Sequence, residues 1–183
     1  RDGLVKAAMC FPDLYEIGMS NNAIRIIYDL INKVDSGLCD RVFAVAPDFE
    51  QLLRKKDVPL FTLQEHFPVK SMKYLGISIG YELCATNVLQ VLDLAGIPLH
   101  AEDRKEDDPI VFAGGPAVTN PLPFASFFDF ITIGEAERNM EFIIKTIEKY
   151  PTRAQRIEAL KDNPYLWFPG RKLATRAVDN TFG

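Results

Sequence analysis

Small and polar residues follow four apolar segments of the chain, and their types suit ligand binding better than catalysis. They are Asp13, Ser78, the pair Gly114-Gly115, and the pair Gly134-Glu135. Glycine lets a backbone approach a ligand closely, and a few polar groups fix the orientation of a ligand in an apolar site. Asp13 with Glu16 or Glu135 forms only a loose carboxylate group, and no Ser/His/Asp or Cys/His set falls on these loops. We therefore expect a binding site without a catalytic residue or a metal ligand.

The same loops lack the motifs of several nucleotide-binding folds. The first apolar segment is not followed by G-x-G-x-x-G, and the chain has no G-x-x-x-x-G-K-[ST] run, so dinucleotide and P-loop chemistry are not indicated. A phosphoacceptor domain would need an aspartate where this chain has Ser78. A flavodoxin-like phosphate loop would need several hydroxyl groups after the first strand, where Ser20 stands alone.

Charge, hydropathy and cysteine usage exclude further classes. The net charge is −4 and no basic cluster is present, which argues against nucleic-acid binding. No apolar run approaches the ~18 residues that a membrane span needs. Cys10, Cys39 and Cys84 are odd in number and far apart in the sequence, so neither a disulfide framework nor a CxxC metal clip is indicated, which favours a reducing cytoplasm. Because the chain opens on Arg1 instead of methionine, we expect it to be a piece of a longer protein.

Strand-like and helix-like segments alternate, which is typical of βαβ units and a parallel sheet. Strands are expected at 4–11, 41–46, 74–79, 110–113 and 130–133, with a weaker one at 172–177. Helices are expected after a cap at Ser20 or Asn21, from Asp48 with Gln51 in a capping box, before Gly96, over 135–150 and near 155–160. The five main strands predict a doubly wound α/β sheet, Rossmann-like or flavodoxin-like, in the order 2-1-3-4-5.

This fold places the four loops at one edge of the sheet. Ligands of doubly wound sheets bind beyond the carboxyl ends of the strands, near the switch between the first and third strands. We expect residues 1–150 to form this domain and residues 151–183 to form an appendage of a helix and a strand.

Three of the loops resemble the motifs of the cobalamin-binding domain, which uses this fold with DxHxxG, SxL and GG after the first, third and fourth strands. The matching positions are Asp13-x-Tyr15-x-x-Gly18, Ser78-x-Gly80 and Gly114-Gly115. Longer strings resemble the N-terminal domain of an uncharacterised bacterial family of radical S-adenosylmethionine (radical SAM) proteins. They are FPDLYEIGMSN, GISIGYEL, TNVLQVLDLAGIPL, AGGPAVTNPLP and IGEAE, within residues 4–150.

The resemblance implies an accessory domain placed before a radical SAM barrel, which would be its partner. In such enzymes a CxxxCxxC run holds a [4Fe–4S] cluster that binds S-adenosylmethionine. This chain has no such run, so the cluster and S-adenosylmethionine are expected only beyond Gly183. The resemblance also implies a set of cofactor-binding residues: Asp13, Tyr15, Gly18, Ser78, Gly80, Gly114, Gly115, Gly134 and Glu135.

Two departures from the cobalamin pattern shape the prediction. Tyr15 replaces the histidine, and a protonated phenol is a poor cobalt ligand that would offer Asp13 only an O–H. His66 and His100 are not obvious substitutes, and Gly80 replaces the apolar leucine and opens space. We expect cobalamin, or a related flat cofactor, to bind without a protein lower ligand, or weakly. The alternative is a degenerate domain that has lost its ligand and serves for docking.

Overall fold

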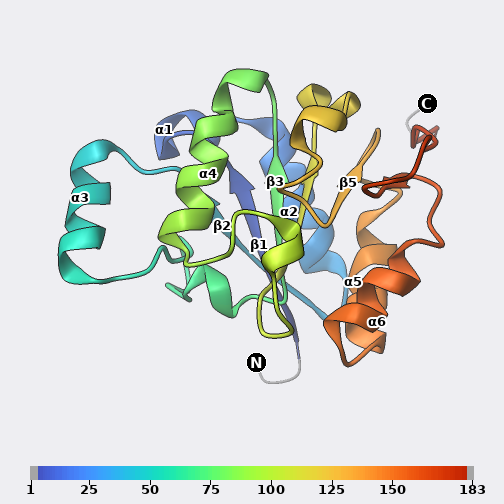
Figure 1. Ribbon diagram of the computed structural model, residues 1–183, viewed down its shortest axis with the longest axis horizontal. Coiled ribbons are helices and arrows are strands. Elements are labelled where there is room, and N and C mark those ends of the chain that lie inside the picture. Colours follow the sequence, from blue (N-terminus) through green and yellow to red (C-terminus); the bar gives the residue numbers. More distant parts are fainter. Residues whose placement is uncertain (1–3, 181–183) are drawn as a thin grey trace.

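The computed structural model describes residues 4–180 and contains a six-stranded sheet in the order β2-β1-β3-β4-β5-β6 (Figure 1). The parallel strands are β1 (Val5–Phe11), β2 (Gly37–Phe43), β3 (Tyr74–Ser78), β4 (Ile110–Gly114) and β5 (Phe130–Thr132). The predicted α/β class and the order of these strands are confirmed. The predicted count is corrected, because β6 (Leu166–Trp167) adds a sixth strand, antiparallel to β5.

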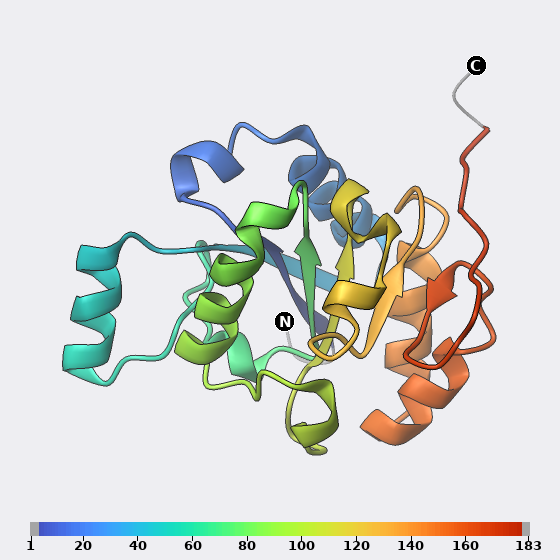
Figure 2. The ribbon, with the colours of Figure 1, turned by 45° about the horizontal axis from the view of Figure 1, so that its top comes forward.

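Helices cover both faces of the sheet (Figures 1 and 2). They are α1 (Tyr15–Gly18), α2 (Asn22–Lys33), α3 (Pro47–Lys56), α4 (Ala85–Leu94), α5 (Met140–Lys149) and α6 (Arg153–Leu160). The short 3₁₀ turns are η1 (Val69–Ser71), η2 (Glu82–Cys84), η3 (Ala101–Asp103), η4 (Pro116–Thr119) and η5 (Leu122–Phe124). Asn21 caps α2 as predicted, because its side-chain oxygen accepts from the N–H groups of Ala23 and Ile24.

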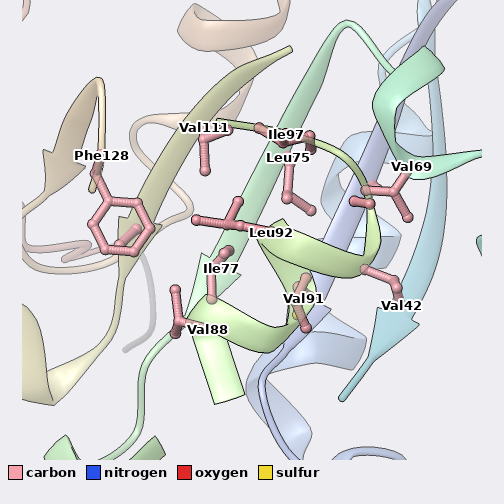
Figure 3. Packing of buried hydrophobic residues seen from close by; sticks show 14 of the residues in the cluster. Val42, Val69, Leu75, Ile77, Val88, Val91, Leu92, Ile97, Val111 and Phe128 are labelled. Atoms are coloured by element: carbon pink, nitrogen blue, oxygen red, sulfur yellow. The ribbon is translucent and has the colours of Figure 1, made fainter. Parts of the chain in front are cut away.

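Alternating side chains of the strands belong to two separate hydrophobic cores, one on each face of the sheet. Leu75 and Ile77 of β3 point to the face that α4 covers, where they pack against Val88 and Leu92 (Figure 3). Tyr74 belongs to the opposite core, which α2 and α5 close. Because β1, β3 and β4 are buried on both faces, their sequences are continuous apolar runs instead of alternating ones.

Several predicted boundaries are wrong. β2 covers residues 37–43 instead of 41–46, because its bonds to β1 begin at Gly37. α3 has no side-chain cap, since the Asp48 carboxylate accepts from the next N–H group, and Pro47 occupies its first turn. α5 starts at Met140, five residues later than predicted, after a loop that begins at Gly134 with φ +96°. Residues 172–177 form no strand; Ala177 makes only a single bridge to Gly134.

Buried charges join the region after residue 150 to the rest of the sheet. The Asp129 carboxylate accepts from Arg104 at 3.2 Å and also from Arg153, the first residue of α6. Arg153 donates in addition to the carbonyl of Pro109, and Asp129 accepts from the N–H of Val111. Removing one partner of such a buried pair leaves an uncompensated charge, so this cluster fixes α6 against β4 and β5.

Candidate functional site

The loops that follow β1, β3, β4 and β5 meet at the carboxyl edge of the sheet. Parallel pairing sets Ser78 at the end of β3 directly beside Gly114 at the end of β4. On the α2 face of this edge the protein contains a cavity of about 180 Å³. Its lining comprises Met9, Ala23, Ile26, Ile27, Ile77, Ser78, Phe112, Gly114, Gly115, Pro116, Thr132, Gly134, Ala136, Glu137 and Met140. The cavity therefore brings together four of the nine predicted site residues: Ser78, Gly114, Gly115 and Gly134.

Glycines form the floor of this cavity because neighbouring atoms leave no space for side chains. A Cβ added to Gly114 would lie 2.5 Å from the hydroxyl of Thr132. Gly115 has φ +110° and ψ 170°, a conformation that only glycine adopts readily, and an added Cβ would lie 2.5 Å from the carbonyl oxygen of Ile79. Gly134 has φ +96°, and an added Cβ would clash with the backbone of Ala177. A bound group would thus contact the backbone directly.

Polar groups are few in the cavity. The Thr132 hydroxyl donates to the carbonyl of Ala113 at 3.3 Å. Ser78 is 8% exposed, and within residues 4–180 its hydroxyl makes no hydrogen bond. Glu137, a residue that sequence reasoning did not single out, adds a half-buried carboxylate to the lining. The IGEAE string contained Glu137, but only the start of α5 at Met140 shows that it lies in a loop over the cavity.

Asp13 lies outside the cavity lining and is bonded to a tyrosine other than the expected one. Its carboxylate accepts the hydroxyl of Tyr81 at 2.6 Å and the N–H of Leu14 at 2.8 Å. The pKa of Tyr81 is raised, mainly by the hydrogen bond to Asp13, because loss of the phenol proton would break this bond. The expected contact between Asp13 and Tyr15 is therefore wrong, and the bond to Tyr81 joins the loop after β1 to the loop after β3.

Tyr15 and Gly18 lie outside the cavity lining, over Phe43 at the end of β2. Tyr15 is 47% exposed, and its ring packs edge-to-face on Phe43, with ring centroids 5.6 Å apart. Gly18 is buried, and an added Cβ would clash with the Phe43 ring. The absence of a side chain at Gly18 lets α1 approach β2, so its local role here is packing.

Gly80 and Glu135 are exposed and do not line the cavity. An added Cβ at Gly80 would have no heavy atom within 4 Å, so open space surrounds this position, as the loss of the motif leucine implies. The N–H of Glu135 donates to the carbonyl of Ala177 at 3.1 Å, and its carboxylate accepts from the N–H of Asp179. Glu135 thereby attaches residues 177–179 to the loop that follows β5.

The cysteines and histidines do not form a metal site. Cys10 and Cys39 are buried in strands, and burial raises the pKa of both thiols well above the ordinary value. His66 and His100 are exposed and contact the rings of Phe61 and Phe127. Within residues 4–180 no group of three or more His, Cys, Asp or Glu side chains could hold a metal ion. These residues do not fit a [4Fe–4S] cluster.

Over the described part of the chain, no helix is both long and apolar enough to cross a membrane.

Comparison with known proteins identifies the family. Searches of curated proteins and of solved structures gave no match. Residues 23–169 match the family described as the N-terminal part of radical SAM proteins. The match includes α2 from Ala23 onward and the ends of β3, β4 and β5, and hence the whole cavity lining apart from Met9. The chain therefore belongs to the family of N-terminal domains of radical SAM proteins.

Proposed function

We propose that this chain is an accessory domain of a radical SAM enzyme, and that the cavity beneath α2 receives the tail ring of a cobalamin-type cofactor without a histidine ligand. The observation that carries the proposal is the cavity floor, which contains Ser78, Gly114 and Gly115, three positions of the cobalamin-type motifs. The volume of about 180 Å³ is below the ~300–1,000 Å³ of whole-ligand pockets. It suits one ring system rather than an entire macrocycle.

The residues present fit the tail of such a cofactor but not a cobalt ligand. Tyr15 packs on Phe43, and the Asp13 carboxylate that would orient a histidine is bonded to Tyr81. The Ser78 hydroxyl has no hydrogen-bond partner within residues 4–180 and is available to a ring nitrogen. Gly114 and Gly115 let a ring lie against the backbone, and apolar side chains of α2 exclude water. When bound, cobalamin supplies the radical or group-carrying chemistry of its cobalt.

The test is a visible-spectrum titration with hydroxocobalamin, compared with cobinamide, which lacks the nucleotide tail. We expect hydroxocobalamin to bind more tightly than cobinamide. Ser78→Ala should weaken only the binding of hydroxocobalamin, by about fivefold, as expected for one hydrogen bond. Ser71→Ala is the matched control, because Ser71 precedes the other end of β3 and its hydroxyl donates to Pro68. Equal binding of both compounds, or a nitrogen-ligated cobalt spectrum, would contradict the proposal.

A second candidate function is docking, and two exposed leucines favour it. Leu83 in η2 is 86% exposed and Leu122 in η5 is 71% exposed, and both turns follow carboxyl ends of strands. Large apolar side chains at such exposure suggest contact with another protein surface, here the radical SAM part of the parent protein.

Leu83→Asp and Leu122→Asp in the parent protein test this second function. If the edge docks, both variants should increase hydrogen exchange in the loops after β3 and β4, while hydroxocobalamin titrations of the isolated domain stay unchanged. Unchanged hydrogen exchange in these loops of the parent protein would contradict docking through this edge.

A further inference from the structure

A second hollow lies beside the exposed end of β2 and is separate from the cavity beneath α2. It is a groove of about 370 Å³, here called the α1–α3 groove, because residues of α1 and α3 contribute to its walls. Its lining comprises Leu14, Tyr15, Glu16, Val42, Phe43, Ala44, Val45, Ala46, Phe49, Leu60, Phe61, Leu63 and His66. No residue of this set lines the cavity beneath α2.

Aromatic rings form two walls of the α1–α3 groove. On one side Tyr15 contacts Phe43 edge-to-face. On the other side Phe61 contacts Phe49 with ring centroids 6.4 Å apart and an interplanar angle of 83°. Tyr15 and Phe49 are 47% and 39% exposed, so part of each side chain remains accessible to a ligand. Half-exposed rings from two helices that line one hollow form a continuous apolar surface, which is a feature of ligand-binding grooves.

His66 extends the second wall in a strained backbone conformation. Its φ is +54°, in the left-handed region that residues with a Cβ seldom adopt. This conformation places the imidazole in edge-to-face contact with Phe61, at 5.8 Å between ring centroids. The turn that carries His66 is fixed by the buried carboxylate of Asp40, which accepts from the N–H groups of Gln64 and Glu65. The wall is therefore built before any ligand arrives.

The charge of the groove favours a cation. Glu16 is exposed, and within residues 4–180 it forms no hydrogen bond or ion pair. The lining contains no lysine or arginine. Aromatic faces carry negative potential and attract organic cations, which also prefer apolar surroundings to a degree that metal ions do not. Glu16 adds a full negative charge to the same hollow.

We propose that the α1–α3 groove binds a small organic cation, an ammonium group carried on an apolar or aromatic body. The apolar body lies between the two aromatic walls, and the cation lies near the Glu16 carboxylate. The site is independent of the cavity beneath α2, so each site can be occupied or removed alone.

The test uses benzyltrimethylammonium as the cationic probe and benzyl alcohol as the neutral one, titrated into the chain with ligand-observed NMR. Benzyltrimethylammonium should bind at least about threefold more tightly than benzyl alcohol, as expected for partly exposed cation–aromatic contacts. Glu16→Gln should remove most of this preference. Phe49→Leu should weaken the binding of both probes, whereas Leu52→Ala is the control, because Leu52 is 48% exposed on the same helix and does not line the groove.

Each outcome decides the proposal. Loss of the cation preference in Glu16→Gln, together with weaker binding of both probes in Phe49→Leu but not in Leu52→Ala, supports it. Equal affinity of the two probes, or a Glu16→Gln variant with wild-type preference, overturns the choice of a cation. Absence of binding at millimolar probe concentration overturns the site. Circular dichroism of each variant verifies the fold, and all three substituted side chains, Glu16, Phe49 and Leu52, are exposed in the wild-type protein.

Discussion

The cavity beneath α2 and the α1–α3 groove lie at the same edge of the sheet but are built from different parts of the chain. Backbone forms the cavity floor, at glycines where an added Cβ would meet Ile79, Thr132 or Ala177. Side chains form the groove, with rings that are only partly buried. The hydrogen bond from Tyr81 to Asp13 joins the loop after β3, which follows Ser78 of the cavity, to the loop after β1, which precedes Leu14 and Tyr15 of the groove. The cavity therefore depends on fixed backbone geometry, while the groove depends on side chains that can change without loss of the fold.

The largest effect is expected on the cavity floor. Gly115→Ala should lower the free energy of unfolding by about 3 kcal/mol, because a side chain is strained at φ +110° and its Cβ would lie 2.5 Å from the Ile79 carbonyl. Gly96→Ala should cost about 1 kcal/mol, since its φ is +67° but the surrounding space is open. Gly80→Ala has neither cost and should be nearly neutral. Urea unfolding of the three variants measures this order. A Gly115→Ala variant with the wild-type free energy of unfolding would show that the backbone of the cavity floor can shift to accept a side chain.

A smaller effect is expected in the groove. Phe49→Ala should lower the free energy of unfolding by about 1 kcal/mol or less, because the ring is 39% exposed and therefore buries only part of its surface. Loss of an entire ring would then cost less than one added methyl group at Gly115. The same urea experiment compares them, and a cost for Phe49→Ala above that of Gly115→Ala would reverse the distinction between the two regions.

The bond between the two regions should respond to alkaline pH. Its acceptor, Asp13, raises the pKa of Tyr81 in the folded protein above the ordinary value. The stabilisation is therefore fully present below the unfolded pKa of ~10 and is lost as pH rises through the higher folded pKa. Wild type should lose more stability than Tyr81→Phe between pH 8 and 11. The effect is small because Tyr81 is exposed. Urea midpoints of both proteins at the two pH values measure it. Equal losses of stability in wild type and Tyr81→Phe would contradict a contribution of the bond.

The smallest effect, on the visible spectrum of added hydroxocobalamin, is expected from Tyr15→His, which recreates the DxHxxG motif in the sequence. Residue 15 packs on Phe43 beside the α1–α3 groove, and Asp13 is already bonded to Tyr81. The new imidazole should therefore not ligate cobalt, and the visible spectrum of added hydroxocobalamin should match that with wild type. A nitrogen-ligated spectrum in Tyr15→His alone would show that the loop after β1 rearranges and that the two regions are not independent.

Local sequence determined much of the fold. Buried runs such as those of β1, β3 and β4 are apolar on both faces, so they indicate a parallel sheet, and short βαβ connections leave few possible strand orders. Asn21 predicts the start of α2 because a cap is a local hydrogen bond. The small residues after four strands predict a ligand edge, since parallel pairing brings carboxyl ends together.

The division of that edge into two sites depends on contacts between distant segments. β6 has two residues, too few for an alternating pattern, and it forms because β5 has an open side. The bond between Asp13 and Tyr81 joins residues 68 positions apart, so no local pattern predicts it. Gly18 allows α1 to fold over Phe43 and carries Tyr15 away from the cavity that holds Ser78 and Gly114. Residue types near one edge predict binding, but contacts between distant segments determine which side chains share a site.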